Sequence, residues 1–395
     1  MGPLGTDTAV GVVGAGAMGS GIAQVAAVAG HRVVIADADA SAVSRARDGL
    51  AKALTREVEK GRLTSGADAA ILGRMEFVAG IDDLSRFREC GLVIEAVVER
   101  LDVKRALFQS LEAVTPPDCV LATNTSSLPV AAIGSSCRRP DRVLGIHFFN
   151  PAPVMPLVEI VPSLATSPEV VGAARSLVDA WKKTTVMASD TPGFIVNRVA
   201  RPYYGEAIRM YEEGVADIPT IDWAMKTVGG FRMGPFELMD FIGHDVNFVV
   251  TRSVFEGLFF DPRYRPSVTQ QRLLDAGWLG RKSGRGFYDY ATGAPPPVAT
   301  QDSALGQRVV DRTVAMLVNE AVDAVFMRVA SARDIELAMT KGVNYPKGLI
   351  AWGEEIGLPV ILDRLETLYA EYGEDRYRPS PLLRRAAREG RSLLA

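Results

Sequence analysis

Cysteine and histidine are scarce in this chain, with three residues of each among 395. Cys90, Cys119 and Cys137 form no CxxC pair and are odd in number, so we expect neither a disulfide framework nor a cysteine-based zinc site. Free cysteines fit a reducing compartment, so we predict a cytoplasmic protein. The sequence gives no sign of a metal site of any other kind.

Long hydrophobic runs and an excess of one charge are also missing. No stretch approaches the ~20 apolar residues that a membrane-spanning helix needs, and residues 1–8 have neither the basic nor the apolar part of a secretory signal. The net charge of −3 gives no broad basic field, so we expect neither a membrane nor nucleic acid as a partner. A length of 395 residues predicts two or three domains.

Short β-type segments alternate with helical segments over residues 1–190. Apolar and β-branched runs end in glycines or polar loops, and helical stretches such as residues 41–60 lie between them. This alternation predicts an α/β domain with a doubly wound parallel sheet. The predicted strands are Ala9–Val13, Arg32–Ala36, Gly91–Val97, Val120–Thr123 and Val143–Ile146.

Helical patterns dominate from residue 191 onward and contain an internal repeat. Similar residues recur at a constant spacing of 114 positions, as in Glu206 and Glu320 or Gly234 and Gly348. We predict a duplicated all-α domain, with a first helical domain at 191–290, a proline-rich linker at 291–305 and a second repeat at 306–395. Each repeat would cover an apolar face of the other, so a monomer with an internal pseudo-dimer and a homodimer are both open.

A glycine-rich motif follows the first predicted strand and opens a helix. The acid Asp37 ends the next strand, which is the context that the GxGxxG motif needs in order to bind a dinucleotide. The carboxylate would repel a 2′-phosphate, so we expect NAD rather than NADP, with FAD and a structural turn as alternatives. The motif consists of Gly14, Ala15, Gly16, Ala17, Met18 and Gly19.

His147 and Glu159 are the candidate catalytic pair. His147 follows a predicted strand, where an open α/β sheet places its ligands. Glu159 lies within the apolar run Leu157–Val161 and needs a partner there. A carboxylate that holds the imidazole would make it a suitable base for a hydroxyl proton. A satisfied core histidine and a structural ion pair are the alternatives.

Two polar loops offer neutral hydrogen-bond donors. Ser126 lies in the loop after the strand Val120–Thr123, and Asn197 lies one turn into the helical region. Such donors could hold a hydroxyl or a carbonyl oxygen as charge develops on it. As alternatives, both residues could be turn or cap residues.

The motifs together resemble the L-3-hydroxyacyl-CoA dehydrogenase family over nearly the whole chain. Segments 342–353 and 371–387 are similar to its two-repeat bacterial branch, which includes 3-hydroxyadipyl-CoA dehydrogenases of phenylacetate degradation. The motifs that carry the resemblance are GAGAMG at 14–19, EAVVERLDVK at 95–104, NTSSLP at 124–129, HFFNPAPVMPLVEIV at 147–161, DTPGFIVNR at 190–198 and MGPFELMDFIG at 233–243.

The resemblance implies a Rossmann-type domain and oxidation of a 3-hydroxyacyl-CoA by NAD, with 3-hydroxyadipyl-CoA or 3-hydroxybutyryl-CoA as substrate. It also implies that His147 is the base, Glu159 its partner, and Ser126 and Asn197 the substrate contacts. Coenzyme A would lie near Lys52 and Lys60. The further NAD contacts that it implies are Asp37, Glu99, Lys104, Asn150 and Lys282.

Two other functions stay open on the sequence. One is a β-hydroxyacid dehydrogenase that acts on a free acid, although no GxxxNxxK pattern follows Asn197. The other is a non-catalytic protein that binds NAD, against which the His147 and Glu159 pair argues.

Overall fold

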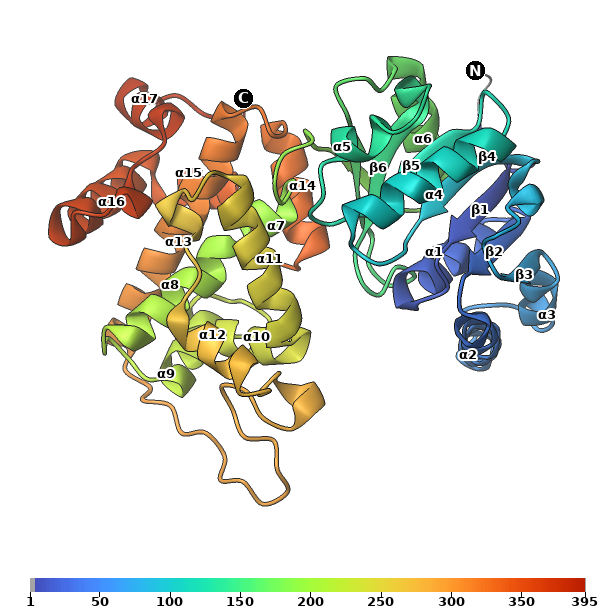
Figure 1. The fold of residues 1–395 in the computed structure, drawn as a ribbon. Coiled ribbons are helices and arrows are strands. Elements are labelled where there is room, and N and C mark those ends of the chain that lie inside the picture. Colours follow the sequence, from blue (N-terminus) through green and yellow to red (C-terminus); the bar gives the residue numbers. More distant parts are fainter. Residues whose placement is uncertain (1–3, 395) are drawn as a thin grey trace. The chain divides into compact units, whose positions relative to one another are not determined.

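The computed structural model describes residues 4–394. The chain divides between residues 191 and 192 into two compact units. The first unit contains a sheet with helices around it, and the second is built from helices (Figure 1).

An eight-stranded sheet forms the centre of the first unit, in the order β3-β2-β1-β4-β5-β6-β7-β8. The chain moves outward from β1 through β2 to β3, and then returns to β4 on the other side of β1. This reversal is the hallmark of a doubly wound sheet, so the predicted fold class is confirmed. The strands are β1 (Ala9–Val13), β2 (Val33–Asp37), β3 (Met75–Ala79), β4 (Cys90–Glu95), β5 (Val120–Thr123), β6 (Val143–Phe148), β7 (Leu157–Pro162) and β8 (Thr184–Met187).

The sheet departs from a wholly parallel arrangement at one place, because β7 runs antiparallel to β6. Residues 149–156 connect these two strands. A parallel connection needs a crossover of about a dozen residues, so this short segment can only turn the chain back. The antiparallel register places His147 directly opposite Glu159.

Helices cover both faces of the sheet. Val10 and Val12 of β1 point into one apolar cluster, and Ala9 and Val13 point into the cluster on the other face. This is the alternation expected of a strand buried on both sides. The helices of this unit are α1 (Ala17–Val28), α2 (Ala40–Glu59), α3 (Ala67–Leu72), α4 (Leu101–Val114), α5 (Val130–Gly134), α6 (Pro168–Ala180) and the 3-10 helices η1 (Ser85–Phe87) and η2 (Pro140–Arg142).

The first half of the second unit begins with two consecutive helices, α7 (Val196–Val199) and α8 (Arg201–Glu212). Residues 291–302, all of which are described, lie outside helices and strands. The other elements of this half are α9 (Ile218–Trp223), the π-helix η3 (Ala224–Val228), α10 (Pro235–Ile242), α11 (His244–Gly257), α12 (Val268–Asp275) and the 3-10 helices η4 (Pro262–Tyr264) and η5 (Arg281–Ser283).

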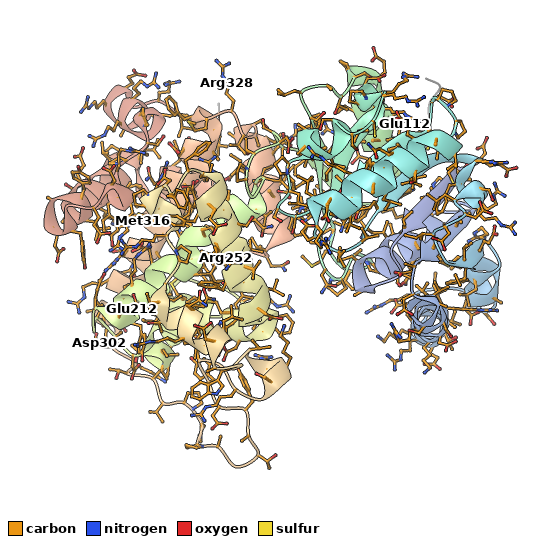
Figure 2. The ribbon with its side chains drawn as sticks, in the orientation of Figure 1. Glu112, Glu212, Arg252, Asp302, Met316 and Arg328 are labelled. Carbon is orange, nitrogen blue, oxygen red and sulfur yellow. The ribbon has the colours of Figure 1, made fainter. Side chains whose placement is uncertain are left out.

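The second half is arranged around the long helix α13 (Ser303–Phe326), which takes up the last residues of the range predicted as linker. Asp302, labelled in Figure 2, caps this helix by accepting hydrogen bonds from the backbone N of Ala304 and Leu305. Most of α13 is buried, and it packs against α8, α15, α16 and α17. The other elements are α14 (Ala332–Gly342), α15 (Leu349–Ile356), α16 (Leu358–Tyr372), α17 (Pro381–Glu389) and the 3-10 helix η6 (Asp375–Tyr377).

Matching positions of the two halves make matching contacts. Asp222 caps α10 by accepting hydrogen bonds from the backbone N of Phe236 and Glu237, both at 2.9 Å. Glu336, which lies 114 positions later, caps α15 in the same way through Ile350 and Ala351 at 2.7 and 3.2 Å. The constant spacing in the sequence therefore has a counterpart in the geometry of the helices, while the division into two helical domains and a linker stays a prediction.

Ion pairs cross between the two halves in both directions. Glu320 of the second half lies 2.8 Å from Nε of Arg198, and the hydroxyl of Tyr264 donates to it. Glu206 of the first half lies 2.9 Å from Nε of Arg312, at the position equivalent to Arg198. Each half thus supplies a buried acid to the other, as two subunits do across a twofold interface.

Candidate active site

The glycine-rich turn joins the end of β1 to the start of α1. Gly14 has a φ of +107°, and a Cβ there would lie 2.4 Å from the carbonyl oxygen of Ala96, so only glycine fits. A Cβ on Gly16 would meet no described atom within 4 Å, so open space lies over this residue. Because Gly16 has no side chain with which to cap α1, the first N–H groups of the helix, at Ala17 and Met18, can face a phosphate. The turn fits the pyrophosphate of a dinucleotide.

Asp37 ends β2 beside this turn. Its Oδ2 accepts a hydrogen bond from the backbone N of Ala15 at 2.7 Å, and its Oδ1 accepts one from Asp39 N at 2.9 Å. A carboxylate oxygen can accept a further hydrogen bond, so Asp37 can hold both the turn and a ribose hydroxyl. A Cβ on Gly19 would lie 1.8 Å from the carbonyl oxygen of Gly14, which explains the third glycine of the motif.

A buried lysine connects two acids at the end of β4. Lys104 Nζ lies 2.6 Å from Glu95 Oε1 and 3.2 Å from Glu99 Oε2, and its side chain is 1% exposed. Buried charges need such partners, so Lys104 holds Glu99 in place, and its direct contact with NAD stays a prediction. The sequence analysis missed Glu95. The signal that could have found it is an acid that ends an apolar strand and needs a partner.

Glu99 in turn fixes the loop that carries Ser126. Its Oε1 accepts hydrogen bonds from the backbone N of Ser126 and Ser127 at 3.0 and 3.2 Å, and the hydroxyl of Thr125 also donates to it. Burial alone would raise the pKa of Glu99, but the Lys104 ammonium and the hydroxyl donors outweigh burial and hold the pKa below its usual value. Glu99 is therefore ionised at neutral pH and orders the loop.

His147 on β6 and Glu159 on β7 form a buried pair. His147 Nδ1 lies 2.6 Å from Glu159 Oε2, and the two residues are 5% and 0% exposed. Side chains directly opposite one another on antiparallel strands are neighbours, so the strand register itself produces the contact. A carboxylate at Nδ1 fixes the tautomer in which Nε2 is the nitrogen that can accept a proton. The ring of Phe149 packs against the imidazole, with 4.6 Å between centroids.

Ser126 and His147 lie at the same edge of the sheet. β5 and β6 are parallel, with Thr123 opposite Gly145. Ser126 comes three residues after Thr123, and His147 comes two residues after Gly145. Both therefore lie at the carboxyl ends of their strands, where α/β sheets bind ligands. The glycine-rich turn after β1 belongs to this edge as well.

A pocket of about 470 Å³ links Asn150 to the glycine-rich turn. It is lined by Gly16 and Ala17 on one side and by Asn150 and Pro151 on the other. The structure therefore brings the predicted NAD contact Asn150 next to the motif, although more than 130 residues separate them in the sequence.

A second pocket, of about 710 Å³, lies beside the C-terminal end of α2. Lys60, Arg56 and Arg62 line it. Lys182 and Lys183 line it too, and Glu57 is the one acid among the lining residues. Such an excess of cations around a pocket fits the phosphates of a nucleotide. Lys52 belongs to the same helix, but it is not among the residues that line this pocket.

Asn197 and Lys282 belong to the second unit. Asn197 lies in α7, and Lys282 lies in η5 with its Nζ 2.5 Å from Asp245 Oδ1. This ion pair holds Lys282 within its own unit. The contacts of Asn197 with substrate and of Lys282 with NAD stay predictions.

The cysteine side chains do not form a reactive centre. Burial raises the pKa of Cys90 and Cys119 to about 12 and that of Cys137 to about 11, so these thiols stay protonated at neutral pH. Within residues 4–394, no group of three or more His, Cys, Asp or Glu side chains is placed to hold a metal ion. No helix in the described part of the chain is long and apolar enough to cross a membrane.

Comparison with known proteins gives one consistent family. The NAD-binding domain of 3-hydroxyacyl-CoA dehydrogenase matches residues 9–191, and the C-terminal domain of the same enzyme matches residues 193–290 and 309–393. The 3-hydroxyadipyl-CoA dehydrogenase of Escherichia coli K12 is 41% identical, over 96% of this chain and 97% of that protein. The 3-hydroxybutyryl-CoA dehydrogenase of Bradyrhizobium diazoefficiens is 42% identical, over 73% of this chain and 97% of that protein.

A solved structure has the same architecture. The crystal structure of 3-hydroxybutyryl-CoA dehydrogenase from Escherichia coli K12 superposes with a TM-score of 0.91 and 40% identity. The match covers 97% of this chain and 98% of that one, so it includes both units of the fold.

Proposed function

The chain belongs to the 3-hydroxyacyl-CoA dehydrogenase family, and we propose that it oxidises (3S)-3-hydroxyacyl-CoA thioesters to 3-oxoacyl-CoA through the pair His147 and Glu159. NAD-dependent oxidation of a hydroxyacyl-CoA is the activity that follows from the family. The observation that carries the assignment of residues is the hydrogen bond between the buried His147 and Glu159 at the ligand-binding edge of the sheet.

In this mechanism His147 is the general base. Nε2 takes the proton of the C3 hydroxyl, and the electrons of the C3–H bond leave as a hydride while the C–O bond becomes a carbonyl. When bound, NAD supplies the nicotinamide ring that accepts this hydride. Glu159 keeps the ring in the correct tautomer and stabilises the imidazolium that results from proton transfer.

Ser126 and Asn197 hold the reacting oxygens in the same proposal. The order that Glu99 gives to the Ser126 loop supports the first assignment. The assignment of Asn197 is supported by its place in the segment DTPGFIVNR, which resembles the family motif. Neutral donors suit an oxygen on which negative charge grows, because they are already oriented when the charge develops.

We also propose the contacts with the cofactor and with coenzyme A, and two pockets of the first unit support part of this proposal. The glycine-rich turn, Asp37, Glu99 and Asn150 would bind NAD, with Lys104 placing Glu99. Lys282 is included as an NAD contact on the family resemblance alone. The basic pocket around Lys60 would hold phosphates of coenzyme A, with Lys52 on the same helix. The three protonated thiols fit a cytoplasmic protein.

The second helical repeat, in this proposal, takes the place of a partner subunit. The support is the exchange of buried ion pairs in which Glu206 and Glu320 play equivalent parts. The match to the Bradyrhizobium relative covers nearly the whole of that protein but only 73% of this chain. This is expected if the relative has one helical repeat. Deletion of residues 301–395 should therefore cause self-association, measured as mass in solution. A soluble, unaltered monomer would exclude this role.

The enzymatic assignment can be tested in the reductive direction with acetoacetyl-CoA. The protein should consume NADH only when the thioester is present, followed by the loss of NADH absorbance. Binding of NADH without consumption would point to a non-catalytic nucleotide binder. Faster reduction of free acetoacetate than of the thioester would point to a dehydrogenase of free acids.

A further inference from the structure

Arg201, at the start of α8, is a buried cation without an acidic partner. It is 6% exposed, and among residues 4–394 no carboxylate forms an ion pair with its guanidinium. Nη1 donates to the hydroxyl of Thr251 at 2.9 Å, and Nε has no hydrogen-bond partner in the described part of the chain. Burial lowers the pKa of Arg201, and the nearby Tyr204 and Tyr345 offset only part of that effect. Arginine nevertheless stays charged at neutral pH. The guanidinium lies over the ring of Tyr204, 4.9 Å from its centroid, but no carboxylate in the described part of the chain balances its charge.

This arginine lines a cavity of about 580 Å³ within the second unit. The volume lies in the range of small-molecule sites. Four arginines line the cavity: Arg201, Arg209, Arg265 and Arg376. Glu212, labelled in Figure 2, lies at the far end of α8 from Arg201.

The acids that line the same cavity are engaged with other groups. Glu213 and Glu374 lie 3.5 and 3.3 Å from the guanidinium of Arg376. Glu212 accepts a hydrogen bond from the hydroxyl of Ser267 at 2.7 Å. The charge at the start of α8 therefore remains for a ligand.

The second repeat shows that the fold does not need a polar side chain at Arg201 or at the positions around it. The equivalent positions, 114 residues later, are apolar and fully buried. Apolar residues at such positions cost less than an unpaired buried charge, so the polar set in the first repeat points to a function. Arg201 corresponds to Ala315, Tyr204 to Val318, Asn247 to Ile361 and Thr251 to Leu365.

We propose that this cavity binds a carboxylate, which pairs with the guanidinium of Arg201. Arginine presents a planar set of N–H donors that matches the two oxygens of a carboxylate. Thr251 takes Nη1 and Nε has no hydrogen-bond partner in the described part of the chain, so the edge that contains Nε is the one that would pair with the carboxylate. Nothing in the family assignment gives this arginine a role.

The carboxylate has two possible sources, of which the first is the distal end of a dicarboxylic acyl chain. This source rests on the proposed function, because Asn197 would hold a reacting oxygen. Asn197 precedes Arg201 by four residues in consecutive helices, which is about 6 Å along a helix. In a 3-hydroxyadipyl chain, C3 and the distal carboxyl carbon are roughly 4 Å apart, so the lengths are compatible. The second source is a free small dicarboxylate.

A matched pair of substrates tests the proposal. Initial rates of NADH formation are measured with 3-hydroxyadipyl-CoA and with (3S)-3-hydroxyhexanoyl-CoA, which carries a methyl group in place of the carboxylate. Arg201→Met should lower the ratio of the two kcat/KM values ~30-fold or more, as expected for loss of a desolvated ion pair. Arg201→Lys should retain part of the ratio. Arg252→Gln removes an exposed arginine of α11, labelled in Figure 2, and should leave the ratio unchanged.

Calorimetric titration with adipate separates the two sources. If the ratio is unchanged in Arg201→Met, but the wild-type protein binds adipate and the variant does not, the ligand is a free carboxylate. If the variant changes neither the ratio nor adipate binding, the proposal is overturned. Failure of the proposed function is distinct from these outcomes, because it would appear as no wild-type activity on the hexanoyl substrate.

The melting temperature of Arg201→Met shows whether a loss of activity comes from loss of the fold. Arg201→Met leaves no buried acid unpaired, so its melting temperature should equal or exceed that of the wild type. A lower melting temperature together with equal losses on both substrates would mean that Arg201 has a structural role, and would overturn the proposal.

Discussion

The reactivity of His147 depends on which of its ring nitrogens is engaged by Glu159. The carboxylate lies at Nδ1, so the proton must arrive at Nε2, and the positive charge that then forms lies next to a buried acid. The same acid would be costly in this position without the imidazole. The pair is therefore both a stable arrangement and a base with the right tautomer.

Glu159→Gln should lower kcat by ~10²-fold or more, because an amide cannot stabilise the imidazolium and can favour the wrong tautomer. The dissociation constant of NADH should change little, since Glu159 lies outside the glycine-rich turn. Steady-state kinetics and fluorescence titration with NADH measure the two effects. Equal losses in turnover and in NADH affinity would assign Glu159 to the structure of the domain instead.

Some residues of the candidate site can be predicted from the sequence, and others cannot, for different physical reasons. Glu159 is predictable because an acid inside an apolar run must have a partner, and His147 is a suitable one. Lys104 contacts Glu99, and Glu99 in turn contacts the Ser126 loop. These contacts depend on how α4 packs at the end of β4, and no local sequence pattern shows that packing. Arg201 looks like an ordinary helical arginine until its burial is known.

Among the secondary-structure elements, the turn between β1 and α1 contains one glycine that the fold needs and one that a ligand needs. Gly14 is required by its positive φ and by the carbonyl of Ala96, whereas Gly16 faces open space. Neighbouring glycines of one motif should therefore respond differently to the same substitution.

Gly16→Val should leave the melting temperature close to that of the wild type but weaken NAD binding strongly, because the new side chain occupies the space that a pyrophosphate needs. Gly14→Val is the matched comparison and should destabilise the first unit. Thermal unfolding and NADH titration of both variants provide the measurements. Normal NADH affinity in Gly16→Val would place the cofactor elsewhere.

The sequence predicts most of the buried strands, but β7 is not among the predicted strands although five of its six residues are buried. β1 matches its predicted range, Ala9–Val13, because all five residues are buried. β3 and β8 lie at the two edges of the sheet and are partly exposed, so their apolar pattern is weak. The direction of β7 follows from the length of its connection to β6, and the apolar run alone carries no information about direction.

At the scale of the whole molecule, the crossed ion pairs join the two repeats of the second unit. Glu206 is buried among Arg209, Arg312 and Arg376, and Glu320 is held by Arg198 and Arg263. The repeat itself is predictable from its constant spacing in the sequence. The exchange of partners is not, because spacing does not show which copy an arginine contacts.

Glu206→Gln should destabilise the second unit by about 3–5 kcal/mol, because it leaves buried arginine charge without its acid. Glu320→Gln should have a similar effect, since it holds the equivalent place in the other repeat. Urea unfolding followed by circular dichroism measures both changes. A loss for one variant with no loss for the other would contradict the symmetric exchange.

The stability of the second unit should also depend on pH through Glu206. Burial would raise the pKa of this carboxyl, but Arg209 and Arg312 outweigh burial and lower it from the ordinary value of 4.5. A lowered pKa in the folded state stabilises the fold above the unfolded value, and this contribution is lost as the pH falls through the folded value. The unfolding free energy of the wild type should therefore fall more steeply below pH 4.5 than that of Glu206→Gln. Parallel pH profiles would contradict this role.

The most direct test of the account is the turnover number of His147→Ala, measured as NADH formation from (3S)-3-hydroxybutyryl-CoA at saturating NAD. Loss of a positioned base should lower kcat by ~10²–10⁴-fold, while NADH binding and the melting temperature stay near those of the wild type. Turnover at the wild-type rate would contradict the account, because proton transfer from the C3 hydroxyl would then depend on a different group.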